Sequence, residues 1–234
     1  MTSSLTPTPT LTPTPTPASF VLQDWQTWAP VALSRYGSQL CWLGTSGSVS
    51  CNPNPCGGTV PTATAGNPFV SVLSAIGDGC HSFAQRADGT VAGWGYNGEG
   101  RVSGISTATK FRSLALGGHC TYGIQPDFTM VAAGYNAWGQ CVAPGGTWAY
   151  VAAQYVSVCG VSTSGATSCW GEGHGSPAAN AVLVSRGDKV MCSLAADGTT
   201  TCTGWYALAN PGVALRLVAV DSGNPAGACG IRAD

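Results

Sequence analysis

Charged residues are scarce in this chain of 234 residues, because Asp, Glu, Lys and Arg together make up only 8% of it. A typical soluble domain has about 25%. The formal net charge is −1, so the sequence offers no basic surface for nucleic acid or for an anionic membrane. It also lacks an apolar run close to the roughly 20 residues that a membrane-spanning helix needs. We therefore expect neither a nucleic-acid partner nor membrane insertion.

Side chains that carry chemistry are few as well. Of the three histidines, only His174 lies in a loop with other candidate catalytic groups, Glu172 and Ser176. A nucleophile needs a base and a third group that orients the base, and no orienting group accompanies this set. No Cys-x-x-Cys pair, Ca²⁺ loop or dinucleotide-binding fingerprint occurs. We expect no catalytic residues, no metal and no cofactor, apart from covalently attached O-linked glycans.

Glycine and cysteine are abundant, with 33 and 11 residues. So much glycine without a collagen period indicates many tight turns. Eleven thiols indicate an oxidising compartment, so we expect an extracellular or cell-surface protein. The first residues, Met1 to Ser4, have neither the basic nor the apolar region of a secretory signal. This leaves two interpretations: the signal has been removed, or Met1 is not the natural start.

The chain divides into a Thr-Pro tract, residues 1–17, and a repeat domain, residues 18–234. Alternating proline holds each preceding threonine extended, which predicts a polyproline-II rod. The rod is either a disordered linker or an O-glycosylated stalk, since its threonine hydroxyls are exposed. The tract resembles Thr/Pro-rich segments of algal and plant cell-wall glycoproteins, which implies that its prolines are also hydroxylated and glycosylated. The expected sites are Thr6, Pro7, Thr8, Pro9, Thr10, Thr12, Pro13, Thr14, Pro15, Thr16 and Pro17.

The repeat domain is organised around a hairpin in residues 77–100. Cys80–Gln85 and Thr90–Trp94 are its predicted strands and Arg86–Gly89 its turn, because glycine supplies the positive φ that the turn needs. Five further stretches align with it, with openings 33 to 42 residues apart. Each opens with an aromatic or apolar residue and a β-branched residue or Leu three positions on: Trp28/Val31, Phe69/Val72, Phe111/Leu114, Trp148/Val151, Ala181/Val184 and Leu215/Val218. Strands this short must stack on neighbouring units to bury their faces.

The segment CHSFAQRADGTVAGWGYNGEGR, residues 80–101, closely resembles repeats of the regulator of chromosome condensation superfamily, which includes propeller-type β-lactamase inhibitor proteins. The resemblance covers residues 28–234. It implies an all-β fold, a β-propeller with one repeat per blade. With the six aligned units, this predicts a β-propeller-like array of about six blades, the last incomplete, preceded by the extended polyproline-II tail. It also implies that His81, and His119 beside it in the alignment, are structural. The third unit has Pro126-Asp127-Phe128 at its turn, which predicts a weaker copy.

Three cysteine pairs recur at the same two aligned positions of the repeat, ten residues apart. The equivalent residues of the second unit, Phe83 and Gly93, should face each other across the hairpin, close to disulfide distance. We therefore predict three cross-strand disulfides: Cys41–Cys51, Cys159–Cys169 and Cys192–Cys202. For the other cysteines, a Cys80–Cys120 bridge between blades and a competing Cys51–Cys56 pair stay open. The pairing of Cys141 and Cys229 is not predicted.

The last seven residues, 228–234, align with residues 158–164 and so supply only one arm of the sixth hairpin. An unpaired strand edge recruits another strand. Three interpretations stay open: the chain is a fragment of a longer protein, Ser19–Gln23 folds back onto the edge, or a neighbouring subunit donates a strand. A head-to-tail contact of the last kind, if it does not close into a ring, makes a filament.

Aromatic residues that follow the second strand of a hairpin are the remaining candidates for binding. They are Tyr96, Tyr135 and Trp138. We expect them on one rim of the array, where the resembling inhibitor proteins bind a protein partner and where aromatic faces stack on sugars. The alternative is that they close the core between blades.

These observations predict an extracellular structural or interaction glycoprotein, a subunit of a cell-surface or wall-associated filament. Its expected partners are further copies of itself, head to tail, or other extracellular glycoproteins and glycans. The alternative is a secreted binding module, a lectin or a protein inhibitor, that uses the aromatic rim. An enzyme is the least favoured class.

Overall fold

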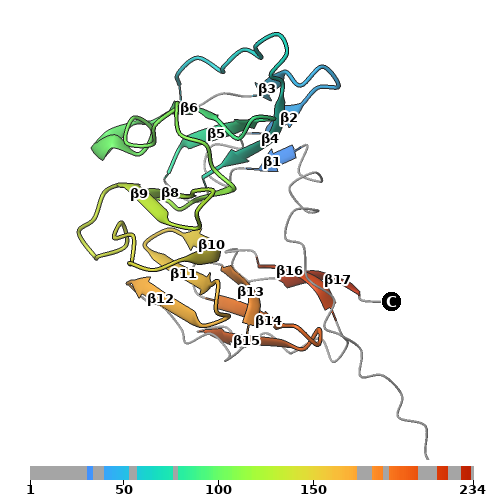
Figure 1. Cartoon of the computed structure of the whole chain (residues 1–234), viewed down its shortest axis with the longest axis vertical. Helices are drawn as coiled ribbons and strands as arrows, with labels where there is room; N and C mark the ends of the chain where they lie inside the picture. Colours follow the sequence, from blue (N-terminus) through green and yellow to red (C-terminus); the bar gives the residue numbers. More distant parts are fainter. Residues whose placement is uncertain are drawn as a thin grey trace, which may run out of the picture.

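The computed structural model describes residues 31–33, 40–52, 57–75, 79–172, 181–186, 190–204, 215–220 and 228–232. These residues form six small antiparallel sheets, five of three strands and one of two, and each sheet consists of strands that are consecutive in the chain. We call the sheets blades 1 to 6. Figure 1 shows them following one another from β1–β3 to β16–β17. The all-β repeat array that the sequence predicts is therefore confirmed.

The blade boundaries follow the predicted units. Blade 1 contains β1 (Val31–Leu33), β2 (Leu40–Leu43) and β3 (Val49–Asn52), and blade 2 contains β4 (Phe69–Ser74), β5 (His81–Arg86) and β6 (Val91–Gly95). Blade 3 contains β7 (Ser113–Leu116), β8 (Cys120–Ile124) and β9 (Met130–Gly134), and blade 4 contains β10 (Trp148–Gln154), β11 (Ser157–Ser162) and β12 (Thr167–Gly171). Blade 5 contains β13 (Ala181–Arg186), β14 (Val190–Ala195) and β15 (Thr200–Gly204), and blade 6 contains β16 (Leu215–Val220) and β17 (Ala228–Arg232). A short 3₁₀ turn, η2 (Gly98–Gly100), follows β6.

The core lies between consecutive blades. The opening residues Phe69, Phe111 and Trp148 are only 3%, 4% and 6% exposed, and each packs with residues of the preceding blade. The aromatic openings therefore join consecutive blades. Trp28, like the Thr-Pro tract, lies outside the described residues.

A backbone hydrogen bond repeats at these junctions. The opening amide of one blade donates to the carbonyl of the turn residue in the blade before it: Phe69 N to Gly47 O at 3.1 Å, Phe111 N to Gly89 O at 2.8 Å, and Trp148 N to Phe128 O at 2.8 Å. Each turn therefore closes its own hairpin and also positions the next blade.

Blade 3 keeps this turn although it lacks the glycine. Phe128 adopts φ 68°, close to the 89° of Gly89, and the Arg112 guanidinium carbon lies 4.3 Å from the centre of its ring. In both turns a threonine binds the aspartate, with Thr90 and Thr129 each donating a hydroxyl hydrogen bond of 2.7 Å to the carboxylate. The contact above the ring and the Asp-Thr pair hold a conformation that is unfavourable for phenylalanine.

Disulfides join the three cysteine pairs that the ten-residue spacing predicts, Cys41–Cys51, Cys159–Cys169 and Cys192–Cys202, with Cα–Cα distances of 4.0 to 4.1 Å. The partners are directly opposite in the strand register. Blade 2 fills the slot with the Phe83 ring, because a Cβ on the opposite Gly93 would lie only 2.6 Å from that ring.

The other two cysteine proposals are wrong. Cys120 bonds Cys141, 21 residues along the chain, and not Cys80, which is also disulfide-bonded. Cys51 bonds Cys41 and not Cys56. The physical reason for the first error is Gly134, the strand partner of Cys120: with no side chain opposite, the Cys120 sulfur reaches the loop after β9 instead.

Candidate functional site

The predicted binding residues lie at one end of blades 2 and 3, where the third strands end. Tyr96 follows β6, while Tyr135 and Trp138 lie in the loop after β9. They are 49%, 37% and 43% exposed. The alternative interpretation, that they fill the core between blades, is therefore wrong.

Two residues that sequence analysis did not single out for binding join this group. His119 precedes β8 and Tyr155 lies in the turn between β10 and β11, so both come from the same end of the blades. The His119 ring centre is 5.6 Å from that of Tyr135, 5.9 Å from that of Trp138 and 4.7 Å from that of Tyr155. Tyr135 and Trp138 meet edge to face at 5.4 Å. We call Tyr96, His119, Tyr135, Trp138 and Tyr155 the aromatic rim.

Arg101 connects Tyr96 to the rest of the rim. Its side chain is almost fully buried, and its guanidinium carbon lies 4.8 Å from the centre of the Tyr96 ring. Arg101 Nη1 donates to Gly118 O at 2.8 Å, and Nη2 lies 2.9 Å from Glu99 Oε2. Nη2 also lies 3.3 Å from His119 Nδ1. Because a guanidinium only donates, this geometry requires Nδ1 to accept, so the His119 proton is on Nε2.

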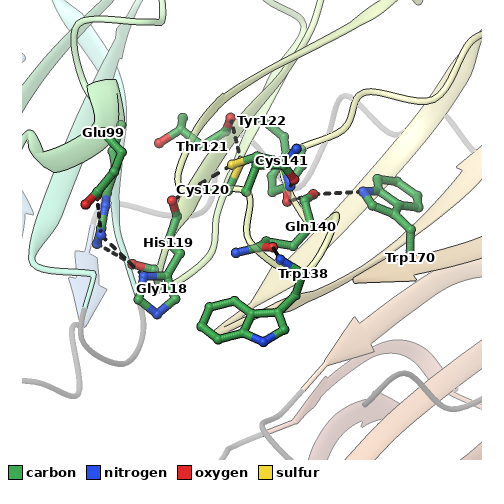
Figure 2. The surroundings of a disulfide bond; sticks show 12 residues. Glu99, Gly118, His119, Cys120, Thr121, Tyr122, Trp138, Gln140, Cys141 and Trp170 are labelled. Carbon is green, nitrogen blue, oxygen red and sulfur yellow. Dashed lines mark hydrogen bonds and ion pairs between the residues drawn. A yellow bond between two sulfur atoms is a disulfide. The ribbon is translucent and has the colours of Figure 1, made fainter. Parts of the chain in front are cut away.

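Gln140 and the Cys120–Cys141 disulfide attach the loop after β9, residues 135–141, to the blades (Figure 2). The Gln140 carbonyl accepts hydrogen bonds from the Tyr122 hydroxyl and from Trp170 Nε1, the latter at 3.0 Å. Its side-chain Oε1 accepts from the Trp138 amide at 3.0 Å. Burial raises the pKa of Tyr122, so this phenol stays a neutral donor. Residues 135–141 are thus held at the base, and their aromatic side chains face outward.

The sequence Gly-Tyr-Asn occurs at residues 95–97 and again at 134–136, and it builds both rim loops in the same way. Asn97 Oδ1 accepts hydrogen bonds from the amides of Val102 and Ser103, at 3.0 and 2.9 Å, and Asn136 Oδ1 accepts from the Cys141 amide at 2.8 Å. The asparagine folds the loop back on itself, and the tyrosine before it is left exposed.

His81 is structural, as the resemblance implies. Its Nδ1 lies 2.9 Å from Gly79 O and its Nε2 lies 2.8 Å from Thr121 Oγ1 in the next blade. Burial, more than any other cause, lowers the pKa of His81 to about 4, so the ring is neutral at physiological pH.

The described residues contain no group of three or more His, Cys, Asp or Glu that could hold a metal ion. Within the same part of the chain, no helix is long and apolar enough to cross a membrane. His174 lies outside the described residues. The aspartates at the hairpin turns are bound to threonines, and the Thr90 hydroxyl and amide lower the pKa of Asp88 to about 2.

The chain is similar in structure to several β-propellers. It superposes on the entire ectodomain of the receptor kinase CR4 from Physcomitrella patens with a TM-score of 0.64 and 22% identity, covering 84% of this chain and 56% of that one. The ectodomain of ACR4 from Arabidopsis thaliana gives 0.61 and 19%, covering 83% and 74%. Prp20p of Saccharomyces cerevisiae, the yeast protein RCC1, gives 0.62 and 14%, covering 84% and 67%.

No family model matches the sequence, and no curated protein matches it. At these identities the likeness establishes the fold alone, an all-β propeller-like array, which yeast RCC1 and the two ectodomains share. The chain spans little more than half of the Physcomitrella ectodomain.

Proposed function

We propose that this protein is an extracellular structural or interaction protein without catalytic activity, and that it contacts its partner through the aromatic rim. The observation that carries the proposal is the rim itself, with three exposed aromatic rings on two fixed loops. Asn97 folds the Tyr96 loop, and a disulfide and a buried hydrogen-bond network hold the loop of Tyr135 and Trp138. Rigid, partly exposed aromatic side chains bind well because little conformational entropy is lost when they are covered.

Two observations support an extracellular location. Four disulfides join pairs of cysteines within the described residues, and structural disulfides persist mainly in oxidising compartments. Two of the similar propellers are ectodomains of receptor kinases.

The more specific form of the proposal is a subunit of a cell-surface or wall-associated filament, with residues 1–17 as a glycosylated Thr-Pro stalk. Blade 6 supports it, because β17 pairs with β16 alone among the described strands while the other blades have three. A strand edge of this kind binds another strand, including one from a second copy. Electron microscopy and size-exclusion chromatography of native material test this form: polymers support it, and a discrete monomer contradicts it.

The second candidate is a secreted binding module, a lectin or a protein inhibitor. The rim favours it, since aromatic rings stack on sugars and anchor protein partners. Prp20p, which shares the fold, is described by its binding to Gsp1p and histones.

Replacement of Trp138 by alanine tests the rim in either candidate. The matched control is Trp42→Ala, which removes another partly exposed tryptophan, 36% exposed, from β2 in blade 1. Binding to native partners and to a glycan array should fall at least tenfold for Trp138→Ala and stay unchanged for Trp42→Ala. Equal losses for the two variants, or no loss for either, would overturn the rim as the contact surface.

A further inference from the structure

A pocket of about 340 Å³ lies at the opposite end of blades 2 to 4 from the aromatic rim. Its wall includes the starts of β4, β7 and β10 and the turn of blade 2. The strand register shows which end this is. Phe69 at the start of β4 pairs with Arg86 at the end of β5, so both lie at the pocket end. Tyr96 follows the end of β6, beside the start of β5, and so lies at the other end. The volume is within the range of small-molecule sites.

Two of the chain's few cationic side chains line this pocket. Arg86 is stacked on Phe69, with its guanidinium carbon 4.8 Å from the ring centre, and Arg112 is stacked on Phe128 at 4.3 Å. A planar guanidinium held over a ring keeps its N–H donors in its own plane, where they match a carboxylate or a sulfate. Arg86 Nη1 also donates to Val91 O at 3.4 Å. Both arginines are therefore oriented before any ligand arrives.

The other lining residues define what the anion is attached to. Ser71 and Ser113 bring hydroxyl groups, and Phe128 and Tyr150 form part of the wall. Gln85 also lines the pocket, with its Nε2 donating to Phe111 O at 2.6 Å. Asp88 also lines the pocket, but its carboxylate accepts hydrogen bonds from the Thr90 amide and hydroxyl at 2.9 and 2.7 Å. Two guanidinium groups against one carboxylate leave the lining with an excess positive charge, in a chain whose net charge is −1.

We propose that this pocket binds an acidic saccharide, with Arg86 and Arg112 holding a uronate carboxylate or a sulfate ester. Aromatic walls fit the C–H faces of a pyranose ring, and hydroxyl and amide side chains fit its hydroxyl groups. The site is separate from the aromatic rim and does not depend on the function proposed for it.

Calorimetric titration of the full chain tests the proposal with three oligosaccharides of equal length: an oligogalacturonate, a sulfated neutral oligosaccharide and its unsulfated parent. We expect binding of one or both acidic probes and at least tenfold weaker binding of the neutral one. Preference for the uronate or for the sulfated probe assigns the anionic group, and either result supports the site. Failure of both acidic probes to bind at millimolar concentration would overturn it, as would equal affinity for inorganic sulfate.

Variants locate the binding. Arg112 is exposed, so Arg112→Gln should still fold, with a small loss of stability from its contact with Phe128 that urea unfolding measures. It should weaken binding at least tenfold, while Arg112→Lys should lose less. The matched control is Lys110→Gln, which removes one exposed positive charge beside the pocket but not from its lining. It should retain binding within twofold, as should the rim variant Trp138→Ala. Equal losses of binding in Lys110→Gln and Arg112→Gln would mean that the oligosaccharide is held only by general charge attraction, and would overturn the pocket as its binding site.

Discussion

The two ends of the blades are built in different ways. At the turn end, short hairpins repeat with the same hydrogen bonds from blade to blade, as at Gly47, Gly89 and Phe128. At the rim end, Asn97 and Asn136 fold two of the loops alike, but other contacts, such as the Cys120–Cys141 disulfide and the Arg101–His119 contact, are not repeated among the blades as far as the structure describes them. The turn end assembles the array, while the rim end can vary without disturbing the assembly. A repeat fold can thus change its binding surface and keep its scaffold.

The largest effect is expected from removing a disulfide, and it should differ between the rim end and a blade hairpin. Removing Cys120–Cys141 by alanine at both positions opens a loop of 21 residues, and removing Cys159–Cys169 opens one of 10. Loop entropy makes either loss cost about 3 kcal/mol of the free energy of unfolding. Only the first should increase amide hydrogen exchange in residues 135–141, measured by mass spectrometry.

The hairpin double variant is the control for general destabilisation. If it raised exchange in residues 135–141 as much as the rim variant did, the rim loop would not depend on its own disulfide. The contrast between a shared scaffold and a locally fixed rim would then be lost.

Acid should weaken the two ends in different pH ranges. Burial lowers the pKa of His81, at the rim end, from 6.5 to about 4. Between these pH values the imidazole is protonated in the unfolded chain and neutral in the folded protein. Stability is therefore lost as the pH falls from about 6.5 to 4, by up to about 3 kcal/mol. Hydrogen bonds from Thr90 lower the pKa of Asp88, at the turn end, from 3.8 to about 2. Its contribution is lost only as the pH falls below about 4.

Urea unfolding at pH 7, 5 and 3 measures both ranges. His81→Gln should remove most of the loss between pH 7 and 5 and a smaller part of the loss between pH 5 and 3, because the His81 range extends down to about pH 4. Asp88→Asn should reduce only the loss between pH 5 and 3. An unchanged slope between pH 7 and 5 in His81→Gln would show that another group causes the loss.

The sequence predicts the turn end well and the rim poorly, for physical reasons. Two cysteines ten residues apart on either side of a short turn must lie opposite each other in the hairpin, so their disulfide pairing follows from the spacing alone. The pairing of Cys120 with Cys141 depends on Gly134 and on the path of an irregular loop, and no other described blade repeats it. The exposed Tyr96, Tyr135 and Trp138 were found from their place after a strand. His119 also contacts Tyr155 of the next blade, and no local pattern encodes a contact across blades.

The smallest effect compares two turns at the same repeat position. Gly89 has φ 89° and Phe128 has φ 68°. Gly89→Ala should cost about 1–2 kcal/mol, because a Cβ is strained at positive φ and would also lie 3.3 Å from Phe111 O. Phe128→Gly relieves the same strain but loses the ring beneath Arg112 and gives the unfolded chain more freedom. These terms oppose one another, so its unfolding free energy should change by less than about 1 kcal/mol, measured by urea unfolding. A loss for Phe128→Gly as large as that for Gly89→Ala would mean that the Phe128 ring, and not the backbone conformation, determines the turn of blade 3.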